Sequence, residues 1–350
     1  MNVIDYLNTY KDISFKDERF NELDALILSL MGYFPFDLIE KKKINSEDVV
    51  SFLETYKPKS KSERKLLDVQ VLKTICTSER FKGIKFLDFA KKRSGEAIEQ
   101  FQAVTIALKD FIFVSFCGTD ATVLGWREDF NMAFLDIVPS EVDAIKYIND
   151  QRHKHPFRDI YIGGHSKGGR LAIRAGKEVY KKNNLKAVFS FDGPNFTDVF
   201  YDAKYDEMKT LIYEYAPNES IIGRLIKDRK KIIIESNAKG IYQHDAYTWQ
   251  VEEDHFVHLD NYTPKSDKIV KVANGVVEKV DNESKSIFVN TFFDLIEKLH
   301  VDELNDDKHT LFVVQSALSS LRIEWKNTPK EHRKVLLKVL LTTLLLMIKK

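Results

Sequence analysis

Apolar and polar residues follow a helical spacing in the first part of the chain and a strand-like spacing further on. Apolar residues three and four positions apart predict a helix over residues 21–32 and another over 44–56, which begins at a Ser46 cap. The apolar runs 103–108 and 111–116 are rich in β-branched and aromatic residues and are separated by two residues. These two runs predict a β-hairpin.

After the hairpin, helical and strand-like patterns alternate. A helical pattern over 140–149 is followed by apolar runs at 160–163, 185–191, 208–216 and 231–235. This alternation is typical of a mainly parallel sheet flanked by helices, so the expected class is α/β. In such sheets, functional residues are expected where the carboxyl ends of strands meet loops.

The sequence changes character in its closing part. We expect residues 1–262 to form one domain with N-terminal helices, and residues 263–350 to form a mostly helical extension. Within the extension, 268–280 is expected to be strand-rich, and helical patterns follow at 288–299 and 310–325.

Residues 335–348 are the most apolar segment of the chain. At 14 residues, with Lys338 inside, the segment is shorter than the roughly 20 residues that span a bilayer. Residues 321–350 carry eight Lys or Arg and two Glu. A basic, apolar helix can lie on an anionic membrane or dock in a groove, so peripheral membrane contact is one expectation. A helix buried in the core is the expectation we favour.

Bulk composition excludes some classes of partner. With 54 Lys and Arg against 53 Asp and Glu, the formal charge is +1, so no global field selects nucleic acid, and we expect no nucleic-acid partner. The two cysteines, Cys76 and Cys117, and an opening segment without an apolar run predict a reducing, cytoplasmic setting.

The segment Ile160–Ala175 carries the candidate nucleophile. An apolar run ends at Gly163, Gly164–Gly168 fits the G-x-S-x-G pattern, and a helical pattern follows. Such a strand-to-helix turn lifts its serine, here Ser166, into the open, with the free N–H groups of the helix aimed at the bond it attacks. A plain glycine-rich turn is the alternative. A Walker phosphate loop does not fit, because no Ser or Thr follows Lys167 as that pattern requires.

A serine nucleophile needs a histidine and an acid. His244 follows the last predicted core strand and is the candidate general base, with a structural histidine as the alternative. Asp192 and Glu219 both lie between Ser166 and His244 in the chain, and that order of nucleophile, acid and base is the one found in α/β-hydrolases. Asp192 is the favoured acid because a short side chain on a Gly-Pro turn holds an imidazole firmly.

Two further segments carry candidate site residues. Gly118-Thr119 ends the second hairpin strand, where the Thr119 backbone N–H and hydroxyl can face a developing oxyanion, and Arg127 is expected to fix this loop. His255 and His258 have a spacing that can hold a metal on a helix, but the pattern provides no third ligand. We therefore expect neither a metal nor a cofactor.

Several motifs together resemble the Mbeg1-like family of α/β-hydrolases and, more distantly, the class 3 lipases. They are Asn21–Ser29, Gln102–Thr105, Phe116–Asp120, Gly125–Phe130, Gly163–Gly169, Phe191–Pro194 and Gln243–Trp249. The resemblance implies an α/β-hydrolase fold. It also implies that Ser166 is the nucleophile, that His244 is the catalytic histidine, and that Thr119 and the Lys167 backbone N–H form the oxyanion hole.

The resemblance fails at the acid. The loop 217–225 looks like the one that carries the aspartate of class 3 lipases, yet Ser220 occupies the matching position. The acid is therefore missing or displaced, and Asp192 and Glu219 remain the candidates.

The resulting expectation is a serine hydrolase that cleaves carboxylic esters through an acyl-serine intermediate. A small-molecule or lipid ester is the expected substrate, and the lipid preference rests on the lipase resemblance. The alternative is a non-catalytic α/β-hydrolase scaffold that binds a partner or a membrane surface, which a missing acid favours.

Overall fold

The computed structural model describes residues 1–58, 63–120, 122–182, 184–297 and 328–348. Nine strands of this part of the chain form one sheet in the order β1-β2-β3-β4-β5-β6-β7-β8-β11. Their bounds are β1 Ile44–Asn45, β2 Lys85–Ser94, β3 Glu99–Ala107, β4 Phe111–Phe116, β5 Asp159–His165, β6 Leu185–Phe191, β7 Ile212–Pro217, β8 Ile232–Ile234 and β11 His258–Leu259. A separate hairpin pairs β9 (Val251–Glu252) with β10 (His255–Phe256).

The sheet is antiparallel at its edges and parallel in its centre. Strands β1 to β4 pair antiparallel, which confirms the predicted hairpin as β3 and β4. Strands β4 to β8 pair parallel, and β11 closes the sheet antiparallel to β8. The loops after β5, β6 and β8 therefore meet at the carboxyl edge of the parallel strands, where functional residues are expected.

Helices cover both faces of the sheet. The helical segments are α1 Val3–Tyr10, α2 Glu22–Leu30, α3 Ser46–Thr55, α4 Glu63–Thr77, α5 Val123–Asn131, α6 Pro139–Lys154, α7 Lys167–Val179, α8 Ala203–Met208, α9 Pro264–Lys279, α10 Asn282–Glu297 and α12 Lys330–Ile348. Short 3-10 turns lie at η1 Met31–Tyr33, η2 Phe36–Leu38, η3 Asp198–Phe200, η4 Lys209–Leu211, η5 Ile222–Arg224, η6 Gly240–His244 and η7 Ala246–Thr248.

Alternate residues of β3 pack into two separate hydrophobic cores, one on each face of the sheet. Val104 and Ile106 of β3 pack with residues of α1 to α4 on one face. Ala103 and Ala107 pack with residues of α6, α7 and α8 on the other. This is the period of two that a strand buried on both faces shows. The chain thus has a three-layered α/β-hydrolase fold, as predicted.

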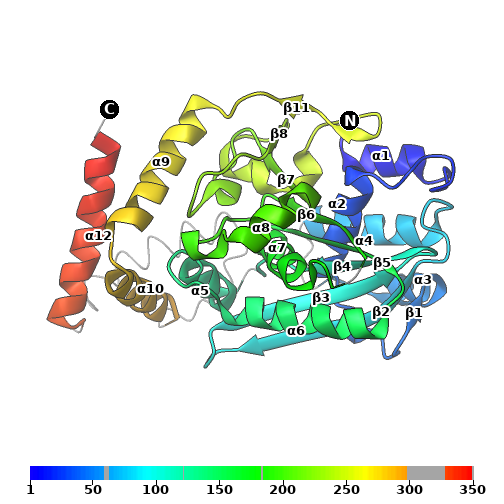
Figure 1. Ribbon diagram of the computed structural model, residues 1–350, viewed down its shortest axis with the longest axis horizontal. Helices are drawn as coiled ribbons and strands as arrows, with labels where there is room; N and C mark the ends of the chain where they lie inside the picture. Colours follow the sequence, from blue (N-terminus) through cyan, green and yellow to red (C-terminus); the bar gives the residue numbers. More distant parts are fainter. Residues whose placement is uncertain (59–62, 121, 183, 298–327, 349–350) are drawn as a thin grey trace.

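The last helices gather at one end of the molecule. Figure 1 shows α9, α10 and α12 at one end, with α10 next to α5, away from the N-terminal helices at the opposite end. Helix α12 packs against α9 and α10, and α10 packs against α5. A small core of Val123, Phe134, Val289 and Phe293 joins α5 to α10.

Two details differ from the expectations, and a third expectation is not tested. The prediction of a strand-rich segment at 268–280 is wrong, because residues 268–279 lie in helix α9 and Val280 caps it. The cap of α3 is Asn45, whose side chain accepts the N–H of Asp48, and Ser46 is the first helical residue. The helix expected at 310–325 lies outside the described residues.

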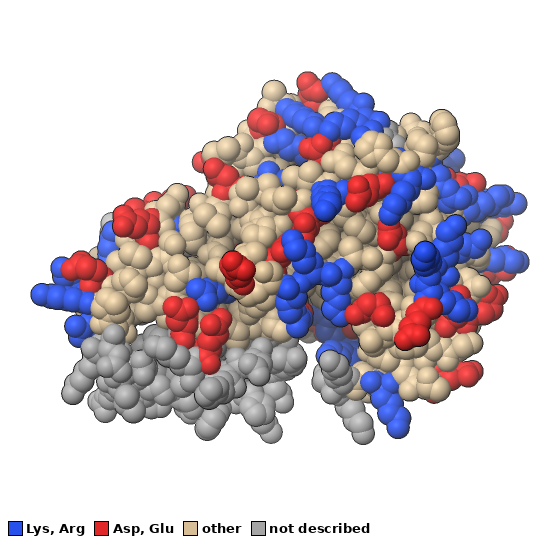
Figure 2. Space-filling model, turned by 90° about the horizontal axis from the view of Figure 1, so that it is seen from below, with Lys and Arg blue, Asp and Glu red and all other residues tan. Residues whose placement is uncertain are grey.

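Charge is mixed over the surface. Figure 2 shows acidic and basic side chains interspersed over the face that it presents, in keeping with the formal charge of +1. Among the described residues, no helix is long and apolar enough to cross a membrane.

Candidate active site

Ser166 occupies a strained turn between β5 and α7. Its φ of 59° and ψ of −132° lie outside the regions that residues with a side chain readily adopt. The backbone N–H of Ser166 donates to the Phe191 carbonyl at 2.9 Å, which ties the turn to the end of β6. The serine is thus held at the carboxyl edge of the parallel strands.

Two glycines allow this turn to pack. A Cβ on Gly164 would lie 2.2 Å from the carbonyl carbon of Gly168, and a Cβ on Gly168 would lie 2.1 Å from the Phe116 carbonyl oxygen. Both obstacles are backbone atoms, which cannot rotate away. The glycines of the G-x-S-x-G pattern are therefore required by close backbone approach.

Asp192 and His244 lie in direct contact. His244 Nδ1 donates to Asp192 Oδ2 at 2.6 Å. Asp192 follows β6 with a φ of 52° and is 1% exposed. An ionised carboxylate can only accept, so this contact places a proton on Nδ1 and leaves Nε2 of a neutral His244 as the basic nitrogen.

The other oxygen of Asp192 has its own partners. Oδ1 accepts the Ser220 hydroxyl and the Gly223 N–H, the latter at 3.1 Å. Ser220 is the residue that stands at the expected position of the lipase acid. Here its hydroxyl binds a carboxylate that comes from the neighbouring strand.

Glu219 points to a different group. Its carboxylate accepts the backbone N–H of Gly240, and its own N–H donates to Gln243 Oε1 at 2.8 Å. Glu219 therefore anchors the turn η6 that carries His244. The structure brings Asp192 to the imidazole and Glu219 to the backbone four residues before it.

His165 contacts the backbone of His244, and Tyr33 in turn contacts His165. His165 Nε2 lies 2.7 Å from the His244 carbonyl oxygen, which can only accept, so Nε2 carries the proton. Nδ1 then accepts from the Tyr33 hydroxyl at 3.0 Å. Burial, together with the nearby His244 ring and the Arg64 guanidinium, holds the pKa of His165 well below its usual value, which keeps the ring neutral. No sequence pattern links Tyr33 to this site.

Thr119 contacts an acid beside the serine. Its hydroxyl donates to Asp129 Oδ2, so the hydroxyl hydrogen is engaged and the backbone N–H is the group left to face an oxyanion. Burial raises the pKa of the Asp129 carboxyl to about 6, although Lys167 and the Thr119 hydroxyl favour its charged form.

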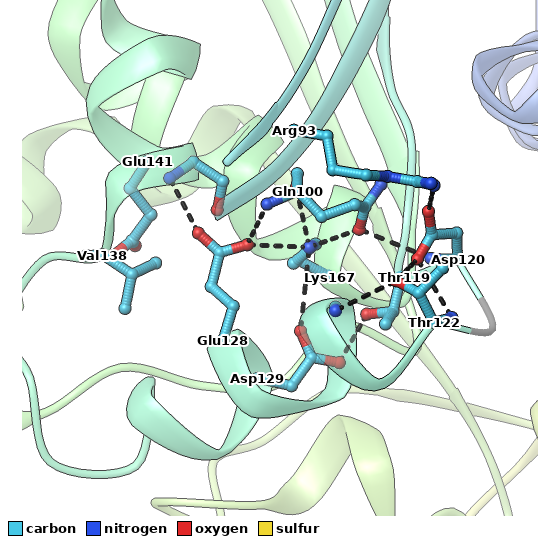
Figure 3. A network of polar contacts seen from close by, with 12 residues as sticks. Arg93, Gln100, Thr119, Asp120, Thr122, Glu128, Asp129, Val138, Glu141 and Lys167 are labelled. Carbon is cyan, nitrogen blue, oxygen red and sulfur yellow. Dashed lines mark hydrogen bonds and ion pairs between the residues drawn. The ribbon is translucent and has the colours of Figure 1, made fainter. Parts of the chain in front are cut away.

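The side chain of Lys167 forms a buried network (Figure 3). Its Nζ donates to Glu128 Oε2 at 3.0 Å, to the Gln100 carbonyl at 2.9 Å and to Gln100 Oε1 at 2.6 Å. Burial alone would lower the pKa of Lys167, but the carboxylates of Glu128 and Asp129 raise it overall. The sequence pointed only to the Lys167 backbone N–H. The side chain joins α7 to α5 and β3.

Arg127 does not fix the Thr119 loop as expected. Its guanidinium donates to Asn290 Oδ1 at 2.9 Å and pairs with Asp294 at 3.1 Å. Both partners belong to α10. Arg127 therefore fastens α5 to the C-terminal helices, and Asp129 contacts the Thr119 hydroxyl instead.

An apolar cavity of about 800 Å³ reaches Ser166. Asp129 and Lys167 also line it. The rest of its wall is largely aliphatic and aromatic and comes from α5, the turn η5 and helices α9, α10 and α12: Trp126, Phe130, Ile222, Ile226, Ile269, Val272, Val276, Phe288, Val289 and Val339 among them. Its volume lies in the range of pockets that enclose ligands of moderate size.

No metal centre is formed by the residues that the structure describes. They contain no group of three or more His, Cys, Asp or Glu side chains arranged to hold a metal ion. His255 and His258 lie on β10 and β11, not on a helix, so the spacing that suggested a metal pair has a different geometry.

The fold and this arrangement together define a protein of the α/β-hydrolase class. The chain belongs to the Mbeg1-like family, whose sequence profile matches residues 75–294.

Several solved structures of lipases are similar to this chain at low sequence identity. A fungal lipase is 13% identical with a TM-score of 0.44, over 68% of this chain and 84% of that one. The Rhizomucor miehei lipase propeptide complex is 13% identical with a TM-score of 0.40, over 67% and 68%. The lipase from Rhizopus microsporus var. chinensis is 12% identical with a TM-score of 0.36, over 57% and 78%. No curated protein matches the chain in sequence.

Proposed function

We propose that the protein hydrolyses carboxylic esters with an apolar acyl chain, through an acyl-Ser166 intermediate. The observation that carries this proposal is the contact between His244 and Asp192 beside a strained serine that borders an apolar cavity. The same contact supports hydrolysis over the alternative of a non-catalytic scaffold, which a missing acid would favour. A cytoplasmic location belongs to the proposal, because Cys76 and Cys117 are free thiols, which a reducing compartment preserves.

The proposed reaction runs in two steps. Ser166 Oγ attacks the ester carbonyl carbon while His244 Nε2 takes the hydroxyl proton, and Asp192 stabilises the imidazolium that forms. The backbone N–H groups of Lys167 and Thr119 stabilise the oxyanion. When the intermediate collapses, the alkoxide leaves and takes the proton from His244. Water, activated by the same histidine, then attacks the acyl-serine and releases the carboxylic acid.

The apolar wall of the cavity supports a substrate with a long acyl chain. Helices α9, α10 and α12 contribute most of the aliphatic side chains of this wall. Only a few charged groups, such as Asp129 and Lys268, are among the lining residues. Such a wall binds hydrocarbon by removing apolar surface from water. Lipid or another fatty ester is therefore the proposed substrate class.

A series of p-nitrophenyl esters of increasing acyl length tests the proposal. We expect Ser166→Ala to lower turnover by on the order of 10³-fold or more. Val276→Phe places an added ring in the cavity and should shift the kcat/KM ratio of long to short esters by on the order of tenfold toward short ones. Val142→Phe on α6, an exposed valine, is the matched control and should leave the ratio unchanged. Full activity of Ser166→Ala would exclude the mechanism, and equal profiles of the two valine variants would exclude the cavity as the acyl site.

A further inference from the structure

Helix α12 exposes a continuous row of leucines. Residues 337, 340, 341, 344 and 345 follow the spacing of one helical face, and each is a leucine. Their exposed fractions run from 48% for Leu337 to 63% for Leu345. Single exposed apolar residues are ordinary, but a row of five on one helix marks a surface that contacts something apolar.

The opposite side of α12 is apolar as well. Leu336 and Val339 are buried, and Val339 and Thr343 line the cavity that reaches Ser166. The face toward α9 and α10 therefore already serves as the packed face of an ordinary amphipathic helix. The leucine row is additional to it, so packing within the described chain does not account for these five residues.

Cations precede the leucines on the same side of the helix. Lys330 and Lys334 lie seven and three residues before Leu337, which continues the same helical face. Arg333 adds one more positive charge, whereas Lys338 pairs with Asp281 at 2.6 Å, and Glu331 is the single acid among residues 328–348. Positive charge is concentrated here although the whole chain carries only +1.

We propose that the leucine row and its adjoining cations form an interfacial docking surface for an anionic lipid layer. Leucines can enter the acyl region while the lysines remain at the charged headgroups. A second copy of α12 fits less well, because it offers the same cations and a single acid, Glu331, among residues 328–348.

The helix that carries this surface also lines the cavity, through Val339 and Thr343 on its other side. Ile269 of α9 lines the cavity and is 40% exposed, so the apolar lining reaches the surface on the helix packed against α12. Docking would bring the helices that line the cavity close to a lipid layer, a purpose that rests on the proposed function. The binding itself does not depend on catalysis.

Sedimentation with vesicles tests the proposal in the full-length Ser166→Ala chain, which keeps bound lipid intact. With vesicles of phosphatidylcholine and phosphatidylserine, we expect Leu341→Ser/Leu345→Ser to lower the partition coefficient by on the order of tenfold or more. Phe157→Ser/Val199→Ser is the matched control, because these side chains are 94% and 70% exposed on other elements. The control should bind as Ser166→Ala alone does.

A charge series separates headgroup attraction from apolar insertion. Lys330→Gln/Lys334→Gln should weaken binding to anionic vesicles by on the order of tenfold and leave binding to pure phosphatidylcholine unchanged. Absence of vesicle binding in the Ser166→Ala chain, or equal losses in the leucine variant and its control, would overturn the proposal. So would a dimer that forms without vesicles and is lost in the leucine variant. Ester turnover of the catalytically intact chain is measured separately, so failure of docking is distinguishable from failure of the proposed hydrolysis.

Discussion

At the scale of single residues, Asp192 joins three segments. Its φ of 52° turns the carboxylate so that one oxygen meets His244 and the other meets Ser220 and the Gly223 N–H. The approach is close enough that a Cβ on Gly223 would lie 2.2 Å from Asp192 Oδ1. A left-handed φ is tolerated better by aspartate than by most residues with a side chain.

Substitution of the two candidate acids distinguishes them. Asp192→Asn should lower kcat by on the order of 10³-fold or more, because an amide favours the wrong tautomer of His244, as seen for a protease triad. Glu219→Gln is the matched control and should cost less than about tenfold, since its carboxylate contacts the Gly240 backbone. The ester assay measures both. A large loss in Glu219→Gln with near-normal Asp192→Asn would assign the acid to Glu219.

The elements around Ser166 are coupled by the buried Lys167–Glu128 pair. Glu128 lies on α5 and also accepts the backbone N–H groups of Gln100 and Ser140, at 3.1 and 2.9 Å. One ion pair thus fixes α5, which lines the cavity, against β3 and the start of α7. Both partners are almost fully buried, so loss of one leaves a charge without compensation.

Unfolding in urea tests this coupling. Lys167→Met should lower the free energy of unfolding by roughly 3–5 kcal/mol, because it leaves the Glu128 carboxylate buried and unpaired. Lys167→Met/Glu128→Gln should recover a large part of the loss. Lys82→Met, which breaks an exposed pair with Glu79, is the control and should change little. Equal stability of Lys167→Met and the unchanged protein would show that the pair does not hold these elements together.

Sequence patterns predicted some elements well and others poorly, for physical reasons. The hairpin at 103–116 and the elbow at Ser166 are encoded locally, in β-rich runs and in glycines that a sharp turn requires. Residues 268–280 are rich in valine and isoleucine, which suit a strand, yet Ile269, Val272 and Val276 also share one helical face. In the folded protein this helical face lines the cavity. Tertiary contacts of this kind override the local preference of the sequence for a strand.

At the scale of the whole molecule, the candidate site depends on contacts between distant parts of the chain. Chain order and the G-x-S-x-G pattern suggested Ser166, His244 and Asp192, but not the contact of Ser220 with Asp192 or of Tyr33 with His165. Nor did any pattern indicate that α9, α10 and α12 line a cavity over the serine. Such pairings are set by the three-dimensional packing of segments that are remote in sequence, which periodicity does not encode.

The central claim is that Ser166 is an activated nucleophile, and reaction with a fluorophosphonate probe tests it most directly. Only a serine whose proton is accepted by a base reacts rapidly with such a probe, whatever the natural ester is. The account predicts rapid labelling of the full-length protein at the peptide that contains Ser166, loss of labelling in Ser166→Ala, and strongly slowed labelling in His244→Ala. A correctly folded, unchanged protein that stays unlabelled, or labelling that persists in Ser166→Ala, would contradict it.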